Sequence, residues 1–198
     1  MPRFSEKEKE IIREKLLEEG AKLFLKYGLQ KVTIDDLVVS VKIAKASFYK
    51  FYEGKEYLYL DILQQEQKQL FDKLDSVLES NVDMPDGIRV KQVLGKMYEL
   101  LQEFPLLTTV DKDTVEIISR KVSKERLATF SNQGFYAVNA MQNHGIAFRY
   151  DIQTVSAAFS ALYHSWISLQ GLETKVQAEV IGIMLEGIVN QVVVEGKE

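Results

Sequence analysis

The sequence predicts an all-α fold in which a small N-terminal domain precedes a larger helical region. Apolar residues recur at helical spacing along almost the whole chain, and no strand-like alternation persists. Pairs of a hydroxyl residue and an acid or amide three positions later mark the starts of several helices. With 198 residues, 46% of them hydrophobic and 27% charged, the chain has the composition of an ordinary soluble globular protein.

Composition and motif content exclude several classes of protein. The chain has no cysteine, which rules out disulfides, thiolate nucleophiles and cysteine-based zinc sites. No apolar run approaches the ~20 residues that span a bilayer, and the N-terminus lacks the apolar core of a secretory signal. The two histidines lie far apart and no nucleophile–base pattern appears, so we expect no enzyme and no bound metal or cofactor. We therefore expect a cytoplasmic binding protein.

Capping signals define the helices in the first part of the chain. Ser5 with Glu8 and Thr33 with Asp36 form two capping boxes, and Gly28 is suited to end the first helix. The first expected helix starts at 5 and runs to about 27. The second starts at 33, and two more cover 44–51 and 55–80. We expect residues 1–54 to form one domain and residues 55–198 the other.

The second domain is expected to consist of further helices joined by short turns. After a turn at 83–87, a helix runs to about 103, where Pro105 stops it. Asp111 or Asp113 caps the next helix. Thr174 with Gln177 forms a third capping box at the start of the last helix. The remaining expected helices cover 123–143, 154–170 and 174–194.

Residues 33–58 have the layout of a helix-turn-helix DNA-binding domain. Two short helices follow each other across a tight turn, and the second interleaves aromatic and basic residues. Through residue 55 the chain holds 12 lysines and arginines against 9 aspartates and glutamates, a net charge of +3, whereas the remainder carries -7. Basic charge is thus concentrated in the segment that carries the motif, as contact with phosphates requires.

The run YGLQKVTIDDLVVSVKIAKASFYKFYEGKEYL resembles the N-terminal domain of tetracycline-repressor (TetR) family regulators. The resemblance covers about the first 60 residues and rests on an aromatic–Gly pair, a Thr that opens the second helix, a turn, two aromatic pairs, and Lys–Glu before a Leu. It implies a homodimeric regulator, usually a repressor, that binds a palindromic operator and is released by a small effector. The matching positions are Tyr27-Gly28, Thr33, Val41-Lys42-Ile43-Ala44, Phe48-Tyr49, Phe51-Tyr52, Lys55-Glu56 and Leu58.

The residues expected to contact DNA lie on or beside the two short helices. Thr33 offers a hydroxyl and free amides at a helix N-terminus, and Tyr49 offers a phenolic hydroxyl to a phosphate. Phe48 is expected to pack inward instead. The predicted DNA-contacting residues are Thr33, Lys42, Lys45, Ser47, Tyr49, Lys50 and Lys55.

Two departures from the family pattern bear on DNA binding. Lys42 replaces the usual glycine of the turn, which costs ~1 kcal/mol if that position needs a positive φ. Ala44 replaces the usual serine, so the second short helix loses a side-chain N-cap worth ~1 kcal/mol. An alternative function is therefore a dimeric ligand-binding or interaction module whose DNA-binding ability is degenerate.

The last two helices are expected to form a dimer interface. They are apolar on more than one side, and an exposed apolar face requires a partner unless one large core absorbs it. Packing against a second copy as a four-helix bundle satisfies this requirement, and Gly182 and Gly187 allow close approach. The predicted interface residues are Val155, Leu162, Val180, Met184 and Ile188.

Aromatic side chains of the second domain are candidates to line a pocket for the effector, which we expect to be a small apolar or amphipathic molecule. Core packing explains any single one of them better than ligand contact does. The predicted pocket residues are Tyr98, Phe130, Phe159, Tyr163 and Trp166.

Overall fold

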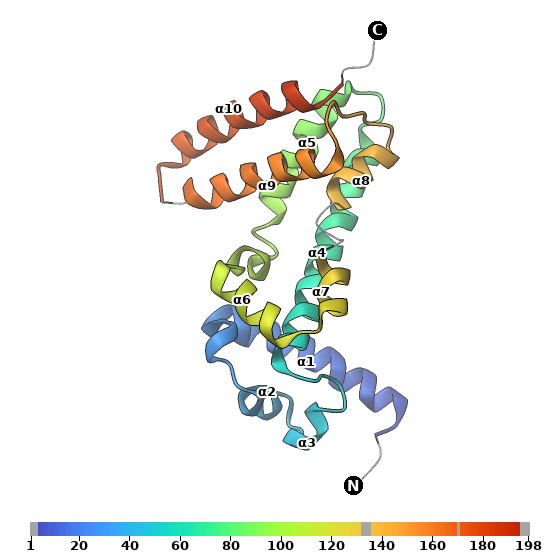
Figure 1. Cartoon of the computed structure of the whole chain (residues 1–198), viewed down its shortest axis with the longest axis vertical. Coiled ribbons are helices and arrows are strands. Elements are labelled where there is room, and N and C mark those ends of the chain that lie inside the picture. The colour runs from blue at the N-terminus through green and yellow to red at the C-terminus, as the bar shows by residue number, and fades with distance from the viewer. Residues whose placement is uncertain (1–3, 132–135, 170, 195–198) are drawn as a thin grey trace. The chain divides into compact units, whose positions relative to one another are not determined.

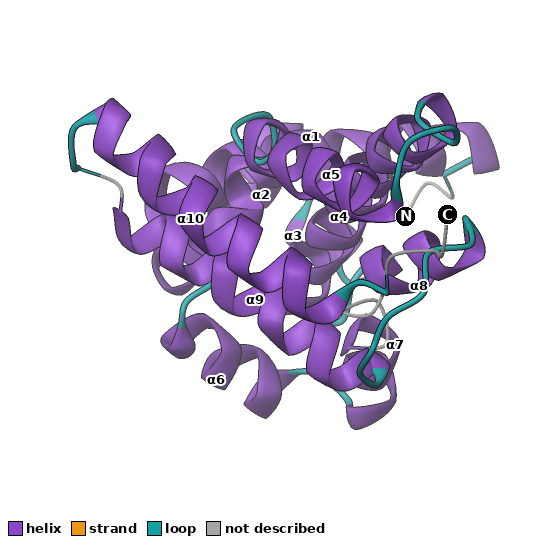
Figure 2. Ribbon diagram, turned by 90° about the horizontal axis from the view of Figure 1, so that it is seen from above, coloured by secondary structure: helices purple, strands orange, loops and turns teal. Residues whose placement is uncertain are grey.

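The computed structural model describes residues 4–131, 136–169 and 171–194, without the side chains of residues 98 and 128–131. Within these ranges the regular structure is helical, apart from one isolated antiparallel bridge between Phe148 and Val193 (Figures 1 and 2). The prediction of an all-α fold is confirmed. The elements are α1 (Glu6–Lys31), α2 (Ile34–Val41), α3 (Lys45–Phe48), α4 (Lys55–Ser80), α5 (Asp86–Leu100), the 3-10 helix η1 (Pro105–Thr109), α6 (Lys112–Lys121), α7 (Lys124–Ser131), α8 (Tyr136–Asn143), α9 (Ile152–Leu169) and α10 (Thr174–Val192).

The chain divides into two compact units. Unit 1 contains residues 1–68 and 104–130, and unit 2 contains residues 69–103 and 131–198. α1, α2, α3, η1 and α6 therefore belong to unit 1, whereas α5, α8, α9 and α10 belong to unit 2. This division differs from the expected boundary at 54/55, because it groups the start of α4 and residues 104–130 with the helix-turn-helix segment.

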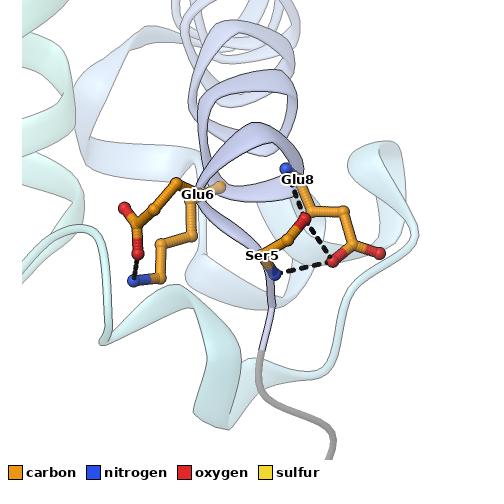
Figure 3. Close-up of polar contacts among 4 residues, drawn as sticks. Ser5, Glu6 and Glu8 are labelled. Carbon is orange, nitrogen blue, oxygen red and sulfur yellow. Dashed lines mark hydrogen bonds and ion pairs between the residues drawn. The ribbon is translucent and has the colours of Figure 1, made fainter.

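The N-terminus of α1 carries the predicted capping box (Figure 3). The main-chain N–H of Ser5 donates to Glu8 Oε2 at 2.7 Å, and the N–H of Glu8 donates to Ser5 Oγ at 3.2 Å. The bond from the Ser5 main chain lowers the pKa of Glu8. At the other end, Gly28 has φ 79°, which breaks the helical geometry as predicted.

Several helix boundaries differ from the predictions, and α9 begins at Ile152 rather than at residue 154. α3 ends at Phe48 rather than near residue 51, and α5 ends at Leu100 rather than near residue 103. The third capping box is wrong, because α10 begins one residue earlier than the pattern implies and Glu173 occupies the N-cap without a side-chain bond. The side-chain amide of Gln177 donates to the carbonyl of Leu172 at 2.7 Å, whereas in a capping box its oxygen would accept from the main-chain N–H of Thr174. The predicted helix over 123–143 appears as α7 and α8, with the residues between them outside the description.

The core of unit 1 joins α1 and α2 to the first turns of α4. Gly20 lies against α4 so closely that a Cβ there would approach Ile62 at 3.1 Å and Leu58 at 3.2 Å. Phe48 is fully buried in the same core, as predicted, and holds α3 against α2. A short recognition helix is thereby fixed by apolar packing rather than by its own hydrogen bonds.

One carboxylate in unit 1 joins three helices. Asp61 on α4 accepts a bond from Arg13 of α1 at 2.9 Å and another from Arg126 of α7, which also bonds to Gln64. The carboxylate is mostly buried, so solvent screens these pairs less than it screens surface ion pairs.

Candidate nucleic-acid interface

The start of α2 is built by the second predicted capping box. The main-chain N–H of Thr33 donates to Asp36 Oδ2 at 2.8 Å, and the N–H of Asp36 donates to Thr33 Oγ1 at 3.2 Å. The side-chain bond from Thr33 lowers the pKa of Asp36. The hydroxyl of Thr33 thus caps its own helix, and the N–H groups of the first turn lie at an exposed helix N-terminus suited to a phosphate oxygen.

The turn between α2 and α3 passes through Lys42. This residue has φ 58° and ψ 45°, and within the described ranges it is the one non-glycine residue with a positive φ. The N–H of Ile43 donates to the carbonyl of Val38 at 3.0 Å, which closes the end of α2. A lysine in this conformation is strained by ~1 kcal/mol relative to glycine, and the side chain projects from the turn into solvent.

α3 begins at Ala44 without a side-chain cap. Four of the following residues are exposed, because the helix buries only Phe48. Tyr49 is 52% exposed, so its hydroxyl is available to a partner molecule. The exposed residues are Lys45, Ala46, Tyr49 and Lys50, and Ser47 is half-buried between them.

Together these side chains define what we call the α2–α3 surface, made of Lys42, Lys45, Tyr49 and Lys50. Lys45 Nζ bonds to Asp35 Oδ2 at 2.9 Å, and this hydrogen bond raises the pKa of Lys45. Lys50 Nζ lies 5.4 Å from the centre of the Phe4 ring. Three cationic groups and one phenol thus share an exposed surface around a helix-turn-helix, which suits a polyanion with hydrogen-bond acceptors.

Lys55 was also expected to contact DNA, but the structure gives its ammonium another position. Lys55 Nζ donates to the carbonyls of Leu29, Gln30 and Val32 at 2.8, 3.1 and 2.6 Å. Its three donors are therefore used to close the end of α1, and burial lowers its pKa. We leave Lys55 out of the contact set and regard it as a residue that positions α1 relative to α4.

Two residues of this region were not among the predicted contacts. Asp35 pairs with Lys45, and Val39, one helical turn further along α2, is 74% exposed. The only sequence signal for them was their spacing of four residues, which places both on the face of α2 opposite the buried Leu37, Val38 and Val41. We return to this pair of residues below.

Comparison with known proteins relates the helix-turn-helix segment to a protein family. Residues 16–62, which contain α2, the turn and α3, match the profile of the bacterial regulatory proteins of the tetR family. Over this segment, about a quarter of its length, the chain is similar to the TetR family. The predicted resemblance is thus confirmed, and it lies on the segment from which it was inferred.

Two relatives are similar to part of this chain. It is 28% identical over 90 residues to the HTH-type transcriptional repressor DhaR of Mycobacterium sp. (strain GP1), covering 46% of this chain and 45% of DhaR. It is also 28% identical over 93 residues to IcaR of Staphylococcus aureus (strain Newman), the negative transcriptional regulator of the biofilm operon icaADBC, covering 47% of this chain and 45% of IcaR. Both matches span just under half of the relative's length.

Solved structures share the fold over nearly the whole chain. A TetR family transcription regulator from Marinobacter aquaeolei VT8 has a TM-score of 0.60 at 13% identity, covering 96% of this chain and 99% of that chain. The ketosteroid transcriptional regulator KstR2 of Mycobacterium tuberculosis has a TM-score of 0.55 at 19% identity, covering 94% and 95%. At such identities the likeness concerns the fold.

The predicted interface residues of the chain fall into two groups. Val155 and Leu162 are 0% and 6% exposed in the single chain, so they pack in the core of unit 2 rather than on its surface. Val180, Met184 and Ile188 on α10 are half-buried. Among the large apolar side chains of α10, Ile183 is the most exposed, at 73%, and it was not among the predicted interface residues.

The predicted pocket residues of unit 2 are only partly brought together. Tyr163 and Trp166 line a small apolar cavity of about 30 Å³ between α5, α9 and α10, and burial raises the pKa of Tyr163 to about 12. Phe159 is buried but does not line this cavity, and it packs edge-on against Phe148. The side chains of Tyr98 and Phe130 lie outside the described part of the structure. The cavity has room for about one water molecule.

Two further features limit the chemistry of the described residues. Within residues 4–131, 136–169 and 171–194, no three His, Asp or Glu side chains are grouped so that they would hold a metal ion. In the same ranges, none of the helices combines the length and apolar character that a membrane span requires.

Proposed function

We propose that the chain is a cytoplasmic transcriptional repressor that binds a palindromic DNA operator as a homodimer. The observation that carries this proposal is the α2–α3 surface, where Lys42, Lys45, Tyr49 and Lys50 are exposed around a helix-turn-helix whose apolar side is buried. A recognition helix that exposes cations and a phenol suits the major groove and its flanking phosphates. The names of DhaR and IcaR, a repressor and a negative regulator, support repression.

Dimerisation is supported by the surface of α10. What we call the apolar face of α10 consists of Val176, Val180 and Ile183, which are exposed or half-buried at spacings of three and four residues. A Cβ added to Gly182 or Gly187 would meet nothing within 4 Å, so this side of the helix is open in the single chain. Two copies joined through α10 would present two α2–α3 surfaces to the half-sites of a palindrome.

A small apolar or amphipathic effector would release the DNA. Tyr163 and Trp166 are the residues that support this part of the proposal, because they line an apolar cavity. That cavity is far smaller than the roughly 300 Å³ of a ligand pocket, so binding requires it to open, which is how an effector would favour one state over another. Trp166 is the single tryptophan, so its fluorescence reports directly on ligand entry.

The central experiment measures binding to DNA from the protein's own upstream region, by gel shift at modest salt. We expect specific retention of a palindrome, and we expect Lys45→Ala combined with Tyr49→Phe to lower affinity at least tenfold, because each loses a phosphate or base contact. Lys112→Ala, which removes an exposed lysine on α6, is the matched control and should change affinity by less than threefold. Equal binding of a shuffled duplex would refute the proposal.

A second candidate function is a dimeric ligand-binding or interaction module with degenerate DNA-binding ability. It is favoured by the strained Lys42, the uncapped start at Ala44 and a recognition helix of four residues. The same experiment separates the two functions. If Lys45→Ala and Tyr49→Phe leave DNA affinity unchanged while Trp166 fluorescence responds to a ligand, the second function is the better one.

A further inference from the structure

A carboxylate lies beside the α2–α3 surface, which is unexpected next to a surface proposed to face DNA. Asp35, the second residue of α2, accepts a hydrogen bond from Lys45 at 2.9 Å, and both side chains are more than half exposed. An exposed ion pair adds little to stability. Against a field of phosphates, an unpaired carboxylate is repelled, and this one also cancels the charge of the lysine beside it. The pair therefore contributes neither to folding nor to non-specific attraction in any large measure.

The position of the Asp35–Lys45 pair shows what else the pair can contact. Val39 lies four residues after Asp35 on the same face of α2, and its 74% exposure means that little of the chain covers this face. Lys45 is the first residue of α3, and its side chain is exposed. Asp35, Val39 and Lys45 thus form one open strip that runs from the outer face of α2 to the start of the recognition helix.

The chemistry of this pair is directional. Its carboxylate oxygens accept hydrogen bonds and its ammonium donates them, side by side. In the major groove, a C·G base pair presents the reverse arrangement: cytosine N4 donates, and the neighbouring guanine O6 and N7 accept. A carboxylate is the side chain that pairs with cytosine N4, and lysine is one of the two that pair with guanine O6 and N7. The exposed methyls of Val39 would suit an adjacent thymine methyl.

We propose that Asp35 and Lys45 together read one C·G base pair in each half-site of the operator. Asp35 accepts from cytosine N4 and Lys45 donates to guanine O6 or N7. Asp35 is thus a specificity-determining residue: it opposes binding to DNA in general and favours the sites that satisfy it. This inference rests on the proposed function, since it requires that α2 and α3 face the major groove.

The test is selection of bound sequences from a randomised duplex library with the full chain. We expect the selected half-site to contain one fixed C·G pair, and exchange of that pair for A·T to lower affinity by about 10- to 100-fold. With Asp35→Ala, this discrimination should fall below about threefold, whereas affinity for random duplex should rise. With Asp35→Asn, the preference should move towards A·T, because an amide pairs with adenine N6 and N7.

Glu14→Ala is the matched control, because it removes one exposed carboxylate from α1 in the same unit. It should leave the selected sequence unchanged, and circular dichroism of all variants should match the unaltered chain. The inference is overturned if the chain selects a palindrome but Asp35→Ala and Asp35→Asn select the same one with the same discrimination. If the unaltered chain enriches no sequence at all, the proposed function itself fails and takes the inference with it.

Discussion

The two compact units of the chain expose different kinds of surface. In unit 1, α2 and α3 bury most of their large apolar residues, with Val39 as the exposed exception, and expose Lys45, Tyr49 and Lys50. In unit 2, α10 leaves Val176 and Ile183 exposed although α5 and α9 pack against it. A charged surface can remain in water without cost, whereas an exposed apolar face is usually covered by another protein or a ligand. The difference supports the proposal that unit 1 binds DNA and that unit 2 binds a second copy of the chain.

The largest effect should come from placing a charge on the apolar face of α10. Ile183→Glu should shift the chain from dimer to monomer, raising the dimer dissociation constant at least 100-fold, because a buried unpaired carboxylate costs several kcal/mol. Sedimentation velocity measures the change directly. Val82→Glu, at a similarly exposed residue in the turn between α4 and α5, is the control and should leave the dimer intact. If Ile183→Glu stays dimeric, α10 does not form the interface.

A smaller effect, on stability, should come from a half-buried carboxyl group in unit 1. Glu66 on α4 has a buried oxygen, Oε2, without a hydrogen-bond partner, and burial raises its pKa to about 7. The folded chain thus keeps this proton to a higher pH than the unfolded chain, so stability is lost as pH rises from about 4.3 to about 7. Allowing for solvent screening at this half-buried group, the loss is about 1–2 kcal/mol.

Glu66→Gln should remove this loss. In urea unfolding, the variant should be more stable than the unaltered chain by about 1–2 kcal/mol at pH 8 and nearly equal to it at pH 5. Glu53→Gln, at an exposed residue of the same unit, should change stability little at either pH. A variant that is less stable at pH 8 would show that the carboxylate has a cationic partner in the folded chain.

The smallest effect concerns the turn that connects α2 to α3. Lys42→Gly should raise the free energy of unfolding by about 1 kcal/mol, because glycine adopts φ 58° without strain. It should also weaken DNA binding about threefold if the lysine contacts a phosphate. Thermal unfolding and a gel shift on the same sample separate the two effects. A loss of stability would mean that the Lys42 side chain contributes a stabilising contact.

The sequence predicted unit 1 in more detail than unit 2, and the reason is physical. Capping boxes and turn residues act locally, so Ser5, Thr33 and Gly28 could be placed correctly from their neighbours alone. The prediction for Thr174 was wrong. Its spacing from Gln177 matched a capping box, but the N-cap of α10 is Glu173, one residue earlier. A local pattern specifies a helix start only when the conformation of the preceding backbone is consistent with it.

Which side of a helix is buried depends on contacts between distant parts of the chain. Val155 and Leu162 belong to an apolar stripe that sequence alone could assign equally to a core or to an interface, and the structure places them in a core. Lys55 looked like a phosphate anchor because its partners, the carbonyls at the end of α1, lie more than twenty residues away. The Asp35–Lys45 pair was missed for the same reason, since ten residues and a turn separate them.

The way α4 enters unit 1 has a practical consequence. Leu58 and Ile62 close the space beside Gly20, and Lys55 holds the end of α1. A polypeptide that stops after residue 54 would lack these groups, and the apolar side chains of α1 and α2 that they cover would be exposed to water. The helix-turn-helix segment therefore cannot be fused to another protein as residues 1–54 alone. A hybrid protein built from it must also include the first turns of α4.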